Sequence, residues 1–271
     1  MQKLLVPTDF SEAAFNAYQY AIELAYLMNI PKVQLIHVYS PEVEGDYPTV
    51  IPPVQEYMDI RKKRLEEFKG KINSPDDITI QTELLIGFPV DEIVKQSTDS
   101  SCIVMSTTGE GGLLEKIFGS VSSAVAQKSR CPVFLIPPKQ NFQMYENILY
   151  ASNYESADED MIEAIMEFNK QAKASLHFVH VKDGKEEHFK KTKEEIFEEL
   201  FDDGQPNFSF ELEEVEANSV ASGLNQYAEK NPIDLVVMVN KQRSFWERLF
   251  HKSKVREMVF AAQKPIMVMH L

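Results

Sequence analysis

The sequence contains too little cysteine for a disulfide framework. Its only two cysteines, Cys102 and Cys131, lie in apolar segments, where we expect buried, reduced thiols. Apolar runs are also short, and none approaches the roughly 20 residues that a transmembrane helix needs. The first ten residues lack the charged, apolar and small-residue zones of an export signal. We therefore expect a cytoplasmic protein that has no membrane partner.

Basic residues are outnumbered, with 28 Lys and Arg against 42 Asp and Glu and a formal net charge of −14. Nucleic-acid binding depends on cationic side chains that neutralise phosphates, so this balance argues against a nucleic-acid partner. A mononucleotide is different, because backbone N–H groups and one helix terminus can hold it. Much of the acidity lies between Glu186 and Glu216, where acidic and apolar residues alternate with helical spacing. That pattern predicts a helix with a solvated acidic face and not a metal site.

The second half of the chain repeats the first. Residues 102–136 and 235–269 each run from an apolar strand that ends in Met, through a loop and an E-K-I-F or E-R-L-F segment, to a Pro-led apolar strand. The beginnings match as well, with LLVPTDFS at 4–11 and ILYASNYE at 148–155. A repeat of half the chain is too long for a solenoid and indicates a duplicated domain.

Strands and helices alternate within each half. Strands of the first half are expected at Lys3–Pro7, Lys32–Tyr39, Thr79–Leu85, Cys102–Met105 and Pro132–Ile136. Helices are expected after Ser11 as N-cap, along an apolar side of Met58, Leu65, Phe68 and Ile72, from Pro89, and over Ser120–Ser129. This alternation predicts two tandem Rossmann-like α/β domains, 1–140 and 146–271, each an open parallel five-stranded sheet with helices on both faces.

Ligands of such sheets bind beyond the carboxyl ends of the strands, where the strand order reverses. With the order 3-2-1-4-5, this crevice lies between the first and fourth strands. Asp9 follows the first strand and can accept hydrogen bonds from a ribose, while Gly109 follows the fourth and lets backbone N–H groups approach phosphate. Gly119-Ser120 then begins a helix whose N-terminal N–H groups favour an anion, and Ser122 adds a hydroxyl.

These segments resemble the universal stress protein family, once in each half and over nearly the whole chain. Nucleotide-binding members carry G-x2-G-x9-G-[ST] between the fourth strand and the next helix. Here the same spacing reads Ser106-x2-Gly109-x9-Gly119-Ser120, so the departure is Ser106 in place of the first glycine. VPTDFS near the start and CPV before the fifth strand are equally typical of the family.

The resemblance implies an adenine nucleotide, ATP or else ADP or AMP, with or without Mg²⁺, and a regulatory role in stress response. The residues it implies for the base and ribose are Pro7, Thr8, Asp9, Val38 (through its backbone) and Met105. Those it implies for the phosphate end are Ser106, Gly109, Gly119, Ser120, Val121 and Ser122. The strand histidines His37 and His180 occupy equivalent repeat positions and are expected to be packed.

The second half lacks these features. Asn153 replaces Asp9, the loop 240–246 contains no glycine, and His251-Lys252 replaces Gly119-Ser120. Bulky side chains would stand where backbone should approach phosphate, so we expect this half to be free of nucleotide.

Two other functions remain open. The chain could be a nucleotide-free dimerisation or protein-interaction scaffold of the same fold, a view that Ser106 and the altered second half support. It could also be an enzyme that consumes ATP, but the phosphate loop of ATP pyrophosphatases is missing after the first strand, and slow hydrolysis is the most we expect. Family members commonly dimerise through the last strand, so the resemblance implies that the two halves pair as an intramolecular pseudo-dimer. Further homodimers and unidentified protein partners stay open.

Overall fold

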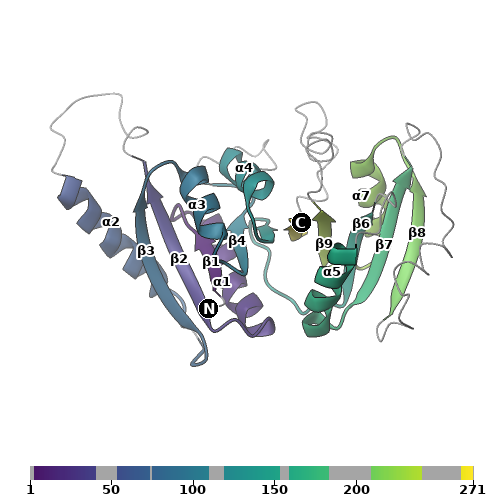
Figure 1. The fold of residues 1–271 in the computed structure, drawn as a ribbon, viewed down its shortest axis with the longest axis horizontal. Coiled ribbons are helices and arrows are strands. Elements are labelled where there is room, and N and C mark those ends of the chain that lie inside the picture. The colour runs from purple at the N-terminus through teal and green to yellow at the C-terminus, as the bar shows by residue number, and fades with distance from the viewer. Residues whose placement is uncertain are drawn as a thin grey trace. The chain divides into compact units, whose positions relative to one another are not determined.

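The computed structural model consists of two compact units, Met1–Phe142 and Gln143–Leu271. It describes residues 3–40, 54–73, 75–109, 119–152, 159–182, 209–239 and 264–270. Each unit is an α/β domain built on a parallel five-stranded sheet (Figure 1). The predicted fold class, two tandem Rossmann-like domains, is confirmed.

The first unit alternates strands and helices along the chain. Its elements are β1 (Leu4–Pro7), α1 (Glu12–Leu27), β2 (Lys32–Tyr39), α2 (Val54–Lys69), β3 (Thr79–Ile86), α3 (Pro89–Ser97), β4 (Cys102–Ser106), α4 (Ser120–Lys128) and β5 (Val133–Ile136). The spatial order is β3-β2-β1-β4-β5, with every pair parallel. The chain therefore changes direction across the sheet between β1 and β4, at the place where the sequence analysis expected the crevice.

The core of this unit lies on β1, β4 and β5, whose residues are all buried. Such strands are covered on both faces, which explains why they are short apolar runs without alternation. α1 packs on α2 through the stacked rings of Tyr18 and Phe68, 5.9 Å apart, while α3 packs on α4. The helices thus form two layers, as right-handed crossovers in this strand order require.

Local signals fix the helix ends as the sequence predicted. The Ser11 hydroxyl accepts a hydrogen bond from the Ala14 N–H at 3.1 Å and caps α1, and Pro89 occupies the first turn of α3. One expectation is wrong in detail, because α2 ends at Lys69 and Ile72 therefore lies beyond the helix. Asn29, at a φ of 53°, turns the chain out of α1.

The second unit repeats this plan. Its described elements are β6 (Asn147–Ser152), α5 (Glu159–Ala172), β7 (Ser175–Lys182), β8 (Phe210–Glu216), α7 (Val220–Lys230), β9 (Leu235–Val239) and β10 (Ile266–Met269). All its strand pairs are parallel, in the order β10-β9-β6-β7-β8. The residues that carry the predicted acidic helix, 189–203, lie outside the described residues, and the acidic stretch ends in a strand, β8.

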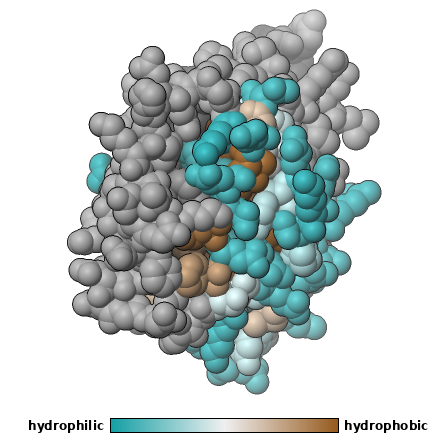
Figure 2. Space-filling model, turned by 90° about the vertical axis from the view of Figure 1, so that its right-hand side faces the viewer, coloured by the Kyte–Doolittle hydropathy of each residue, from teal (hydrophilic) through white to brown (hydrophobic). Residues whose placement is uncertain are grey.

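β8 carries four glutamates, Glu211, Glu213, Glu214 and Glu216. Figure 2 views the molecule from the side on which β8 lies in Figure 1, and hydrophilic residues predominate among those coloured there. Charge on the last strand of a sheet discourages pairing with another chain. Among the described helices, none has the length and apolar character to cross a bilayer.

Candidate functional site

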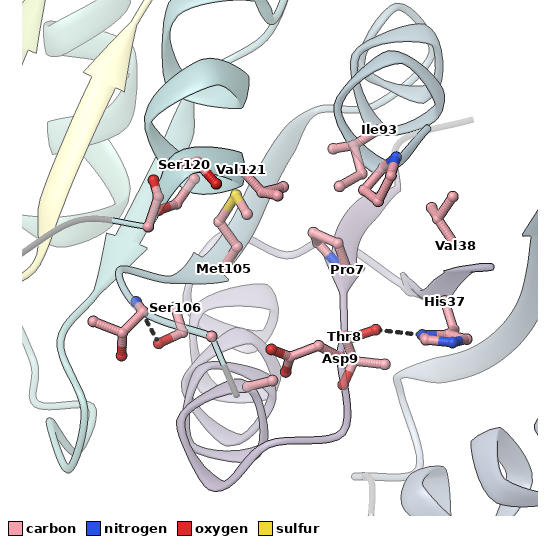
Figure 3. Close-up of a pocket in the computed structure, with 16 residues that line it drawn as sticks. Pro7, Thr8, Asp9, His37, Val38, Ile93, Met105, Ser106, Ser120 and Val121 are labelled. Atoms are coloured by element: carbon pink, nitrogen blue, oxygen red, sulfur yellow. Dashed lines mark hydrogen bonds between the residues drawn. The ribbon is translucent and has the colours of Figure 1, made fainter. Parts of the chain in front are cut away.

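A pocket of about 350 Å³ opens at the carboxyl ends of β1, β2 and β4 (Figure 3). This volume is within the range of small-molecule sites. Its lining residues are Pro7, Thr8, Asp9, Ala14, His37, Val38, Pro89, Ile93, Met105, Ser106, Thr108, Gly109, Gly119, Ser120, Val121 and Ser122. Every residue that the sequence analysis assigned to base, ribose or phosphate lies in this one lining.

Asp9, just beyond β1, holds its carboxylate in a fixed position. Its Oδ1 accepts hydrogen bonds from the Ser11 N–H at 3.0 Å and from the Ser11 hydroxyl at 2.6 Å. The same hydroxyl accepts from the Ala14 N–H, so the cap of α1 and the carboxylate form one hydrogen-bonded unit. Figure 3 shows the Asp9 side chain directed toward the segment that follows β4.

Gly109, in that segment, approaches the carboxylate closely. A Cβ at position 109 would lie 2.7 Å from Asp9 Oδ2, closer than a real Cβ tolerates. A larger residue at position 109 would have to displace the Asp9 carboxylate, so a protein side chain favours glycine here, in addition to the expected approach of phosphate.

The base of the loop between β4 and α4 is closed by three contacts. The Gly119 N–H donates to the Thr107 carbonyl at 2.6 Å. The buried Ser122 hydroxyl lies 3.0 Å from the same carbonyl and 3.1 Å from the Gly119 carbonyl. Because this hydroxyl has one proton and two carbonyl neighbours, Ser122 links Thr107 to Gly119, and the exposed Ser120 presents the more accessible hydroxyl.

Gly119 is the N-cap of α4 and makes no side-chain capping bond. The first N–H groups of a helix have no intrahelical partner, so those of Ser120 and Val121 are available to an anion in the pocket. The dipole of the nine-residue helix favours negative charge at the same point.

Ser106, the departure from the family motif, fits its turn. Its hydroxyl accepts a hydrogen bond from the Thr108 N–H at 3.3 Å, as Figure 3 shows. Ser106 is not among the residues with positive φ, so the backbone at this position does not demand glycine.

The opposite wall of the pocket is apolar. Figure 3 shows five apolar residues along this part of the lining: Pro7, Val38, Ile93, Met105 and Val121. Such a lining suits the flat face of an aromatic ring. The lining residues that the sequence analysis did not assign to the site are Ala14, His37, Thr108, Pro89 and Ile93. The last two come from α3, which contacts β1 and β2, and only the tertiary fold brings that helix to the pocket.

His37 is buried, as expected of a packed strand histidine, but it also lines the pocket. Its Nδ1 lies 2.7 Å from the Thr8 carbonyl and its Nε2 lies 3.1 Å from Arg61 Nη1. The Phe10 ring stands 4.3 Å away between centroids. Burial lowers the pKa of His37, and the nearby Arg61 and Arg64 act in the same direction, against the Thr8 carbonyl and Asp9. The ring is therefore held neutral around pH 7.

The corresponding positions of the second half cannot be compared in the same way. Asn153, the loop 240–246 and His251-Lys252 lie outside the described residues. The prediction that this half is free of nucleotide therefore stays a prediction.

Comparison with known proteins gives a family match in each half. The model of the universal stress protein family matches residues 1–137 and 144–270. A universal stress protein of Methanocaldococcus jannaschii is 33% identical over 147 residues, which are 50% of this chain and 81% of the relative. A second one from that archaeon is 28% identical over 158 residues, 52% of this chain and 97% of the relative.

A solved structure matches nearly the whole length of the chain. The crystal structure of a universal stress protein from Archaeoglobus fulgidus has a TM-score of 0.74, with 20% sequence identity and coverage of 99% of this chain and 96% of that one. At this identity the similarity shows a shared fold.

Proposed function

The chain belongs to the universal stress protein family, and we propose that its first half binds one adenine nucleotide in the pocket at the ends of β1, β2 and β4. The observation that carries the proposal is the convergence of unlike groups around a single 350 Å³ pocket. The carboxylate suits a ribose, the apolar wall suits a base, and the N-terminus of a helix suits phosphate.

The geometry supports a direction for the ligand. The base would lie against Pro7, Val38, Ile93 and Met105, with its polar edge on the Val38 backbone. The ribose hydroxyls would donate to Asp9. The phosphates would then meet the segment of Gly109 and the first turn of α4, where Ser120 offers its N–H and hydroxyl.

We propose that the nucleotide is ATP, ADP or AMP, with or without Mg²⁺, and that its binding regulates the protein during stress response in the cytoplasm. Regulation of this kind requires that nucleotide bind one conformation or partner complex better than another. The protein partners are not specified by the pocket. Any ATP hydrolysis would be slow, because no described lining residue other than Asp9 is a carboxylate, and Asp9 faces the ribose in this proposal.

Asp9→Ala tests the proposal. Losing the carboxylate should weaken ATP binding about tenfold or more, since hydrogen bonds to charged groups contribute about 1.5–3 kcal/mol. Arg243→Ala, in the second half, is the matched control and should leave the affinity unchanged. Nucleotide copurified with the protein from cells would support the proposal independently.

The alternative is a nucleotide-free scaffold. Ser106 was its main support in the first half, and the hydrogen bond from Thr108 to Ser106 now gives that residue a role in the turn. Failure of wild-type protein to bind ATP, ADP and AMP would favour the scaffold.

Pairing of the two halves as a pseudo-dimer also remains a proposal. Its support is the apolar character of β5 and β10, the last strands of their units, and a linker of about ten residues that could extend over about 33 Å. Residues 1–140 expressed alone should then form a homodimer or aggregate, and a stable monomer would contradict the pairing.

A further inference from the structure

We propose that His37 and Thr8 are positioning residues for the base, because their side chains take over two hydrogen bonds of the sheet and thereby free the backbone of Val38 for the ligand. The proposal rests on the adenine-nucleotide site proposed above.

The first displaced bond concerns the Thr8 carbonyl. β1 and β2 are paired in parallel up to Pro7 and Ile36, and the Thr8 N–H continues the ladder by donating to the Ile36 carbonyl at 2.8 Å. In a parallel ladder, a residue whose N–H donates to one position of the partner strand accepts, at its carbonyl, from the N–H two positions further along that strand. Since the Thr8 N–H donates to Ile36, the Thr8 carbonyl should accept from the Val38 N–H. Among the described residues, no such bond joins Val38 to Thr8. The His37 imidazole lies 2.7 Å from the Thr8 carbonyl instead.

The second displaced bond concerns the Phe10 N–H. Continued pairing would direct it to the Val38 carbonyl. It donates instead to the Thr8 hydroxyl at 2.9 Å, and Phe10 has a φ of 68°, which turns the chain away from the sheet. The ladder between β1 and β2 therefore stops short of Val38, whereas β2 stays paired with β3 as far as Tyr39 and Ile86. A side chain satisfies each of the two groups beyond β1, the Thr8 carbonyl and the Phe10 N–H, that Val38 would have paired with.

His37 is locked in the tautomer that this role requires. The Thr8 carbonyl can only accept, so Nδ1 carries the proton; the Arg61 guanidinium can only donate, so Nε2 presents its lone pair. Arg61 is itself held over the Tyr39 ring, 4.6 Å from its centroid. Two partners on opposite sides of the ring thus select one neutral form and keep the donor aimed at Thr8.

Val38 is a lining residue of the pocket, and its freed backbone would offer one donor and one acceptor side by side to a ligand there. Adenine presents an amino donor next to a ring-nitrogen acceptor, whereas a 6-oxopurine has an oxygen acceptor in place of the amino group. The Val38 edge therefore matches adenine and mismatches hypoxanthine or guanine. Because both ring nitrogens of His37 already face the Thr8 carbonyl and Arg61, His37 would act on specificity through Val38.

The duplicated half supplies a matched control. His180 occupies the repeat position equivalent to His37, is buried in β7 and lies outside the nucleotide pocket. Substituting either histidine removes a buried imidazole from an equivalent strand. A change seen in both variants therefore reports a general loss of stability, whereas a change seen only in the His37 variant reports an effect on the site.

The first experiment uses the full chain without nucleotide and measures amide hydrogen exchange at Val38. His37→Asn keeps a donor at the Nδ1 position and should leave exchange as in wild type. His37→Leu removes the donor, so the Val38 N–H should pair with Thr8 and its exchange should slow by about tenfold or more, a protection corresponding to a modest local opening free energy. Equal Val38 exchange in wild type and His37→Leu would overturn the proposal, whether or not the protein binds nucleotide.

The second experiment measures the ratio of ATP to ITP affinity by calorimetry. Wild type, His37→Asn and His180→Leu should share one ratio of ATP to ITP affinity. In His37→Leu this ratio should fall about tenfold, the change expected for the loss of one hydrogen bond. An unchanged ratio in His37→Leu would overturn the positioning role. Wild-type protein that binds neither nucleotide would overturn the proposed function, and the exchange experiment would still decide whether His37 frees Val38.

Discussion

Gly109 and Asp9 fit together so closely that a Cβ at position 109 would lie 2.7 Å from Asp9 Oδ2. The other carboxylate oxygen is held by the Ser11 N–H and hydroxyl, so a shift of the side chain to make room for a Cβ would strain those bonds. A glycine after β4 and an aspartate after β1 thus form one structural unit across the point where the strand order reverses.

Gly109→Ala should therefore weaken nucleotide binding by displacing the carboxylate, by about tenfold. The effect of Gly109→Ala should then largely vanish when Asp9 is already alanine, because the effects of substituting two residues in contact are not additive. Calorimetry on the two single variants and the double variant gives the coupling.

Gly119→Ala is the control for this cycle. A Cβ at position 119 would meet nothing closer than the Ser122 hydroxyl at 3.4 Å, so the pocket should tolerate it with a smaller loss. Full additivity of Gly109→Ala and Asp9→Ala would show that the two residues act separately.

The two thiols should be unreactive in the folded protein. Burial raises the pKa of Cys131 to about 12, and burial together with the neighbouring Cys131 raises that of Cys102 still further. The thiolate is the reactive species, so a thiol reagent should label neither cysteine until denaturant is added. Rapid labelling of the native protein would contradict the packing around β4 and β5.

Stability should fall in mild acid through His37. Its pKa is lowered in the folded protein, chiefly by burial, so the unfolded chain takes up the proton first as pH falls. The contribution of this group is fully present above its ordinary pKa of 6.5 and is lost as pH falls through the lower folded value. Urea midpoints between about pH 7.5 and about pH 5 should drop more steeply for wild type than for His37→Asn, which cannot titrate, whereas parallel curves would contradict this prediction.

Gly223, in α7, tests the packing of the second unit. A Cβ there would lie 2.7 Å from Val181 Cγ2 on β7 and closer still to the other methyl group. Gly223→Ala should destabilise the protein by about 1–3 kcal/mol, the usual cost of overpacking, and leave ATP affinity intact. Gly70→Ala is the control, since its Cβ would meet backbone oxygens at 3.4 Å and 3.7 Å, and its denaturation midpoint should stay near that of wild type. Equal midpoints for the two variants would contradict the clash at Gly223.

Features with a local signal were predictable from the sequence. The span of β2, the Ser11 cap and the start of α3 at Pro89 depend on a β-branched apolar run, hydroxyl capping and the fixed φ of proline, all readable over a few residues. The duplication was readable because the two halves keep matching strand and helix segments. Together these placed the crevice between β1 and β4.

Features that depend on tertiary contacts were not predictable. Nothing local in the sequence shows that α3 would bring Ile93 to the pocket. The sequence predicts only a packed His37, because its partners Thr8 and Arg61 come from the segment after β1 and from α2. The close approach of Gly109 to Asp9 likewise exists only once β1 and β4 are neighbours.

The stoichiometry of ATP binding to the full chain tests the central claim most directly. Isothermal titration calorimetry should give about one nucleotide per chain, and Asp9→Ala should weaken that single site about tenfold or more. A stoichiometry near two, or binding that Asp9→Ala leaves unchanged, would contradict a single site in the first half.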